Sequence, residues 1–137
     1  MPIVFRVDQD ARVIVAAGHG VLREADLFNY QREAWSRSDV AGFDELIDMT
    51  RVIEFAQPSA ERIRDLAKLS AEMDNPVSRS RLAIVASGDF AFGLGRMFQA
   101  YRHLESSSTK EVGVFRTMED ALAFLRVDHP LAMPTFA

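Results

Sequence analysis

The chain has 137 residues, a length that fits one domain with its own hydrophobic core. Its 16 basic and 20 acidic residues give a net charge of −4, which disfavours nucleic acid or an acidic membrane surface as a partner, since both select a basic face. The absence of cysteine excludes disulfides, thiolate zinc sites and cysteine nucleophiles. With no apolar signal segment and no run of about 18 apolar residues, we expect a soluble cytoplasmic protein without a membrane span.

The first third of the chain predicts a hairpin and a helix. Alternating apolar residues at 3–7 and 13–17 indicate two antiparallel strands, joined by the polar turn at 8–10. We expect the Gly-His-Gly sequence at 18–20 to end the second strand, because glycine adopts backbone angles that other residues avoid. Apolar residues at helical spacing then predict a helix over 24–37.

The middle of the chain predicts a short strand, a loop and a second helix. The strand covers 43–49 and the loop 50–57. Pro58 or Ser59 begins the helix, because proline suits the first turn and a serine oxygen accepts hydrogen bonds from the free N–H groups there. The proline of Asp-Asn-Pro at 74–76 stops it.

The last third predicts a buried strand, a helix, a last strand and a final helix. The continuous apolar run at 82–86 is typical of a central strand covered on both faces. A helix follows over 90–104, and a last strand over 112–115. The expected inward face of that helix is Phe90, Leu94, Met97, Phe98, Tyr101 and Leu104. The order ββαβαβαβα predicts an α/β fold: a mixed sheet with an N-terminal antiparallel hairpin and helices packed on it, forming one domain over 1–127 before a tail at 128–137.

Five short stretches of this chain carry a resemblance to a known family. They are Gly18-His19-Gly20, Leu46 to Thr50, Phe92 to Phe98, Phe115-Arg116-Thr117, and Glu119 to Leu122. Together with the element order, they resemble the SpoIIAA-like (STAS, or STAS/SEC14-type) domains, a family of small bacterial proteins of unknown function. The resemblance covers nearly the whole chain and implies a SpoIIAA-like fold that docks another protein. It identifies no reaction or substrate.

Phosphoregulated STAS domains carry an Asp-Ser pair where the helix after the third strand begins. This sequence has no such pair, and Ser59 lies near the corresponding place but is offset from it. We interpret Ser59 as a helix cap. The alternative is a phosphorylated serine, whose added charge would be favourable at a helix N-terminus and would change a docking surface.

Few side chains suggest chemistry. No two of the three histidines are four residues apart, and there is no HExxH motif, so we predict neither a helical metal pair nor a cofactor. His19 is interpreted as a turn residue, with a ligand or base role as the alternative. Asp48 should lie at the carboxyl end of its strand, where open sheets bind ligands, together with Thr50 and Arg51. The simpler interpretation is that Asp48 accepts N–H bonds from the chain that follows it.

The helix predicted over 90–104 has an unusual composition. Gly93 and Gly95 each cost about 1 kcal/mol relative to alanine inside a helix. Either the helix begins only after Gly95, or a ligand or second subunit approaches it closely. Phe92 falls on an otherwise polar face beside Arg96 and His103. We hypothesise that these three residues form a contact surface for a partner or a twin subunit.

We therefore predict a non-enzymatic interaction module of the STAS type, forming a homodimer and docking a protein partner. The alternative is a carrier of a small apolar ligand or lipid, as the SEC14-type label implies and as the aromatic and methionine residues of the third helix suggest. A weaker third interpretation is an enzyme that uses Asp48 or His19, although no nucleophile elbow is present. The predicted binding residues are Asp48, Thr50, Arg51, Ser59, Phe92, Arg96, His103 and His19.

Overall fold

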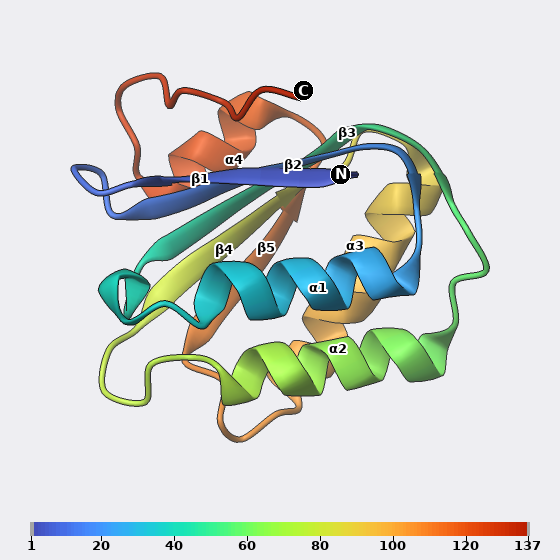
Figure 1. The fold of residues 1–137 in the computed structure, drawn as a ribbon, viewed down its shortest axis with the longest axis horizontal. Coiled ribbons are helices and arrows are strands. Elements are labelled where there is room, and N and C mark those ends of the chain that lie inside the picture. Colours follow the sequence, from blue (N-terminus) through green and yellow to red (C-terminus); the bar gives the residue numbers. More distant parts are fainter. Residues whose placement is uncertain (1, 137) are drawn as a thin grey trace.

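The alternating apolar residues at the start of the chain form the first hairpin of a five-stranded mixed sheet (Figure 1). The computed structural model describes residues 2–136. The strands, adjacent in chain order, are β1 (Ile3–Asp8), β2 (Val13–Leu22), β3 (Asp44–Phe55), β4 (Ser80–Val85) and β5 (Lys110–Phe115). β1 and β2 pair antiparallel, and every other neighbouring pair is parallel. The predicted element order and mixed sheet are therefore confirmed.

Helices cover both faces of this sheet. One face carries α1 (Glu24–Trp35), α2 (Ala60–Glu72) and α3 (Asp89–His103), and the other carries α4 (Met118–Leu125) with the C-terminal segment (Figure 1). A short 3-10 turn, Ser38–Val40, follows α1. Because side chains alternate along a strand, each interior strand contributes to two separate cores.

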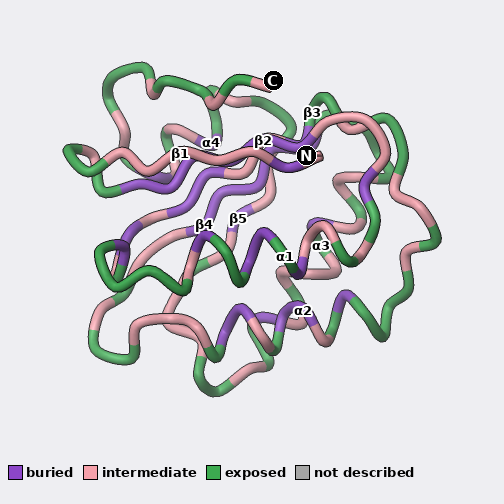
Figure 2. The backbone as a smooth tube through the Cα atoms, in the orientation of Figure 1, coloured by how far each residue is buried: buried purple, intermediate pink, exposed green. Residues whose placement is uncertain are grey.

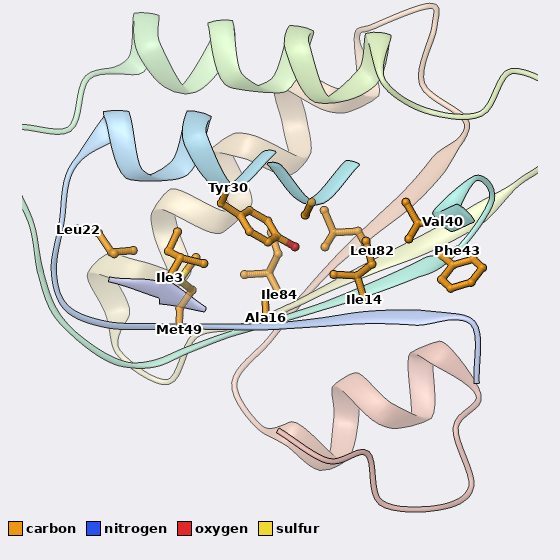
Figure 3. Close-up of a cluster of buried hydrophobic side chains, with 11 residues drawn as sticks. Ile3, Ile14, Ala16, Leu22, Tyr30, Val40, Phe43, Met49, Leu82 and Ile84 are labelled. Carbon is orange, nitrogen blue, oxygen red and sulfur yellow. The ribbon is translucent and has the colours of Figure 1, made fainter. Parts of the chain in front are cut away.

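The larger core lies between the sheet and the first three helices (Figure 3). Ile14 and Ala16 of β2 face it, and Tyr30 projects into it from α1 toward the strands. Val13 and Val15 point to the opposite face, where they pack with the residues of α4. Buried positions accordingly concentrate along the central strands, drawn in purple in Figure 2.

Two predicted boundaries are wrong, and both concern the neighbouring strands β2 and β3. β2 does not end at Gly18 but continues to Leu22, and the expected loop after residue 49 is strand as far as Phe55. The two extensions pair with each other, with shifts in register after Ala17 and after Gly20. Gly20 has φ +68°, so glycine is needed there, but as an irregularity within the strand and not as its end.

α3 also differs from one of the two expectations. It begins at Asp89 and runs through both glycines, so the idea that it starts after Gly95 is wrong. A Cβ placed on Gly95 would lie 2.9 Å from Cγ1 of Val114, so this glycine allows the helix to approach β5 of its own chain. The expected inward residues at the two ends of the helix, Phe90 and Leu104, are 61% and 76% exposed.

Candidate functional site

The carboxyl end of the sheet contains four of the predicted binding residues. Pairing between β3 and β4 ends at Asp48, and β3 then continues with β2 as its only strand partner among residues 2–136. The Asp48 carboxylate accepts hydrogen bonds from the backbone N–H of Thr50 at 2.9 Å and from its hydroxyl at 2.7 Å. This confirms the simpler interpretation, in which Asp48 satisfies an amide just beyond the point where β4 ends.

His19 and Arg51 lie opposite each other in the β2–β3 pairing. Phe136, from the C-terminal segment, packs on both: its ring centroid is 4.0 Å from that of His19 and 5.7 Å from the Arg51 guanidinium carbon. The same segment accepts a hydrogen bond from Arg6 of β1 at the carbonyl of Ala132. The predicted cluster is therefore assembled by the fold, and the tail of the same chain covers part of it.

Apolar side chains are exposed at this same end of the sheet. Ile53 of β3 is 81% exposed and Phe90 in the first turn of α3 is 61% exposed. Phe55, two residues after Ile53, places its ring centroid 6.3 Å from that of Phe90. We refer to Ile53, Phe55 and Phe90 as the carboxyl-end patch. The sequence does not predict this patch, because helical spacing places Phe90 on the inward face of α3.

The surface predicted on α3 is partly covered within the chain. The guanidinium carbon of Arg116 lies 4.1 Å from the ring centroid of Phe92 and so covers the aromatic face that was expected to need a partner. Arg116 is held there by Asp89, whose carboxylate accepts its N–H at 2.7 Å. Arg96 and His103 are exposed on the same helix.

Ser59 is the N-cap of α2. Its hydroxyl oxygen accepts the backbone N–H of Arg62 at 3.2 Å, and its own O–H donates to the Glu24 carboxylate at 3.2 Å. The interpretation of Ser59 as a helix cap is confirmed. The contact with Glu24 also joins the starts of α1 and α2.

A buried polar network between the sheet and α1 was missed by sequence analysis. Glu45, 3% exposed, accepts a hydrogen bond from the Tyr30 hydroxyl at 2.6 Å and one from the Lys110 ammonium at 3.4 Å. The ammonium also lies 3.1 Å from the ring centroid of Trp35. Burial, reinforced by the nearby Glu45 charge, raises the pKa of Tyr30 well above its ordinary value. Burial lowers the pKa of Lys110, while the attraction of Glu45 opposes that change.

A second buried ion pair connects the ends of α2 and α3. Arg102, 1% exposed, donates to both carboxylate oxygens of Asp74 at 3.1 and 2.9 Å and to the Ser70 hydroxyl at 2.8 Å. Asp74 also accepts the backbone N–H of Thr109, just before β5, at 2.9 Å. Because the Asp74 carboxylate, just after α2, satisfies groups of α3 and of the segment that begins β5, we interpret this pair as structural.

An apolar cavity of about 90 Å³ lies between the sheet and the three helices on the larger core. Three buried polar residues, Tyr30, Gln31 and Glu45, are among its lining residues, together with the exposed Arg23. Its other lining residues are mostly apolar: Leu22, Glu24, Leu27, Ile47, Met49, Phe55, Ala56, Pro58, Ile63, Leu66, Leu82, Ile84, Leu94, Gly95 and Phe98. The cavity lining is therefore mostly apolar, with a few groups that can form hydrogen bonds.

Within residues 2–136, no group of three or more His, Asp or Glu side chains is placed to hold a metal ion. No helix in that part of the chain has the length and apolar character needed to cross a membrane.

No family model matches this sequence, and no curated protein matches it. Among solved structures, the chain is similar to the crystal structure of an uncharacterized protein of the DUF3478 family, with a SpoIIAA-like fold, from Shewanella loihica PV-4. The two chains are 20% identical, the match covers 90% of this chain and 91% of the other, and the TM-score is 0.55. The likeness confirms the SpoIIAA-like fold predicted from the sequence and carries no function with it.

Proposed function

We propose that this chain, which has the SpoIIAA-like fold, is a non-enzymatic interaction module of the STAS type that docks a protein partner at the carboxyl end of its sheet. The observation that carries the proposal is the carboxyl-end patch, where Ile53 and Phe90 are 81% and 61% exposed beside a stretch of β3 that has one strand partner. Phe90 is in ring contact with Phe55, and exposed apolar residues that cluster are typical of interaction sites, whereas isolated ones are ordinary.

The patch offers two kinds of contact to a partner. Burying its apolar side chains contributes roughly 25 cal/mol for each Å² removed from water. The β4 side of β3 beyond Asp48 also presents backbone N–H and C=O groups, which an extended segment of a partner can pair with. An apolar, extended segment matches both features.

Asp48 and His19 are the residues considered above for catalysis. The Asp48 carboxylate is occupied by the backbone and hydroxyl of Thr50, and the His19 ring packs against Phe136. These contacts lie within the chain, so the proposal assigns both side chains to the structure of the β2–β3 strand pair.

The experiment compares two double variants that remove exposed apolar side chains at opposite ends of the sheet. Ile53→Ser with Phe90→Ser removes the carboxyl-end patch. Val77→Ser with Leu104→Ser is the matched control, because Val77 and Leu104 are 90% and 76% exposed but precede β4 and β5. Tagged proteins are expressed in the source organism, and the proteins that co-purify with each are quantified by mass spectrometry.

We expect a partner to be retained by the wild type and by the control, and to be lost from the patch variant. Light scattering on the same proteins tests the predicted homodimer: a dimer that dissociates only in the patch variant makes the partner a second copy of this chain. A partner lost only from the control would move the docking site to the other end of the sheet and would refute the proposal.

One observation, the apolar cavity, supports a second candidate function: binding of a small apolar ligand, which is the alternative raised by the sequence. Native mass spectrometry of the freshly purified protein tests it. A bound mass that disappears on denaturation supports the ligand-binding function. If the protein purified from each expression host carries no bound mass, the result counts against the ligand-binding function.

A further inference from the structure

We propose that two copies of this chain associate through β1, whose strands pair antiparallel so that the two sheets become one. This surface is separate from the carboxyl-end patch, so the inference goes beyond the docking function proposed above. Three observations carry it: the open backbone groups of β1, the covered backbone groups of β5, and a sequence along β1 that is compatible with itself.

β1 forms one edge of the sheet, so every second residue along it has no strand to pair with (Figure 1). The carbonyl of Pro2 accepts the backbone N–H of His19 at 2.9 Å, which identifies the even-numbered residues of β1 as those bonded to β2. Ile3, Phe5 and Val7 therefore direct their N–H and C=O groups away from the sheet. Within residues 2–136, no loop backbone bonds to these groups, so this edge is open to another strand.

β5 forms the opposite edge, and its outward groups are bonded by side chains of the same chain. The odd-numbered residues of β5 bond to β4, so Lys110 and Val112 direct their backbone groups outward. The Val112 carbonyl accepts the side-chain N–H of Gln99 at 2.7 Å. The Lys110 carbonyl accepts the Ser108 hydroxyl at 3.4 Å, and its backbone N–H donates to Asp74 at 3.3 Å. These bonds protect β5 from strand addition, which β1 allows.

Two β1 strands related by a two-fold axis have one antiparallel register that uses every open group. With the axis at Phe5, that residue lies opposite its own copy, and Ile3 lies opposite Val7 of the second copy. Each opposed pair exchanges two hydrogen bonds, so all the outward groups of both strands are satisfied. An axis at Arg6 would oppose two like charges, which is destabilising. An axis at Val4 or Val7 would place one of the open residues opposite a position outside β1.

The side chains along β1 suit this pairing. Ile3, Phe5 and Val7 all lie on the face of the larger core, and Phe5 and Val7 are only partly buried there. Apolar pairs across neighbouring strands stabilise a sheet. The charged residues Arg6 and Asp8 are on the opposite face and pair with each other at 3.6 Å. Because β5 is protected, the assembly closes at two copies and does not grow into a fibre.

The test compares proline substitutions at the two edges, with the dissociation constant of the dimer measured by analytical ultracentrifugation. Val7→Pro removes an outward N–H and leaves the hydrogen bonds to β2 in place, because proline is tolerated where an edge strand faces away from its neighbour. Val112→Pro makes the same change on β5, and both valines are partly buried against the larger core. We expect Val7→Pro to weaken the dimer by about tenfold or more, and the control to leave it unchanged.

Amide hydrogen exchange of the wild-type protein decides the question if Val7→Pro does not fold. The amides of Phe5 and Val7 should exchange slowly in concentrated protein and faster on dilution, while exchange at Val112 should not depend on concentration. A wild type that stays monomeric when concentrated, or a dimer that Val7→Pro weakens no more than Val112→Pro does, would overturn the inference. A dimer lost only from the Ile53→Ser, Phe90→Ser variant would also overturn it, and would leave docking at the carboxyl-end patch intact.

Discussion

Gly93 and Gly95 lie in the same turn of α3 and should respond oppositely to replacement by alanine. No heavy atom lies within 4 Å of a Cβ placed on Gly93, so Gly93→Ala gains helix propensity without a clash. That gain is about 0.5–1 kcal/mol in the free energy of unfolding. On Gly95 the added Cβ would lie 2.9 Å from Cγ1 of Val114 and 3.7 Å from Cγ2 of Ile84. Overpacking of this kind costs about 1–3 kcal/mol, which cancels or exceeds the gain.

The two variants should therefore differ by roughly 1–3 kcal/mol in stability, with Gly93→Ala the more stable. Urea unfolding followed by circular dichroism measures the difference directly. Because the clash involves one methyl group, Val114→Ala should cost less in the Gly95→Ala background than in the wild type, giving a coupling energy of about 0.5–3 kcal/mol. Equal stabilities for the two glycine variants, or additive effects in the double variant, would refute the close packing of α3 on β5.

Three further perturbations address the buried network and a helix cap. Lys110→Met leaves the Glu45 carboxylate buried without its cation, so urea unfolding should show a loss of about 3–5 kcal/mol in the free energy of unfolding. Adding Glu45→Gln to this variant should recover much of the lost stability. If no stability is recovered, the result argues against the Glu45–Lys110 pair. The raised pKa of Tyr30 means that above pH 10.0 the folded state keeps a proton that the unfolded state releases, so stability should fall as the pH rises through that range. In a Tyr101→Phe variant, the near-ultraviolet phenolate signal should then appear only as the protein unfolds, and a signal from folded protein near pH 10.0 would contradict this. Ser59→Ala should lower stability by about 1 kcal/mol, measured by the same urea titration, whereas Ser59→Thr, which keeps the hydroxyl, should retain most of it. Equal losses in the two variants would remove the capping role.

The order of elements could be predicted because each one shows its own local pattern. Alternation in β1 and β2, the apolar run of β4 and the capping serine of α2 depend on residues close together in the chain. The extension of β2 and β3 could not be predicted in this way. Two glycines in β2 resemble a strand end, and only the pairing of residues 19–22 with 51–55, some 30 positions away, makes them part of a longer ribbon.

The candidate site was predictable only in part, for the same reason. Asp48 and Ser59 were interpreted correctly, since aspartate after a strand and serine before a helix bind neighbouring N–H groups. The Glu45–Lys110 pair joins residues 65 positions apart, and one signal could have revealed it. Glu45 shares strand parity with the inward-facing Met49, so its side chain had to be buried and needed a partner.

Phe90 illustrates the opposite error. Its position on the helical wheel matches the inward residues of α3, but the helix contacts β5 at Gly95, about one and a half turns later. A helical wheel has no information on where along its length a helix meets the sheet. The exposed ring of Phe90 was therefore assigned to the core, and the carboxyl-end patch was overlooked.

Site-specific photo-crosslinking tests the docking proposal most directly. A photo-reactive phenylalanine analogue is placed at Ile53 in the carboxyl-end patch, or at Val77, which is 90% exposed at the other end of the sheet. The protein is then irradiated in living cells of its source organism. The proposal predicts one discrete crosslinked partner from position 53, which disappears when Phe90 is also changed to serine, and none from position 77. The same crosslinked species from both positions, or a partner captured at position 77 alone, would contradict it.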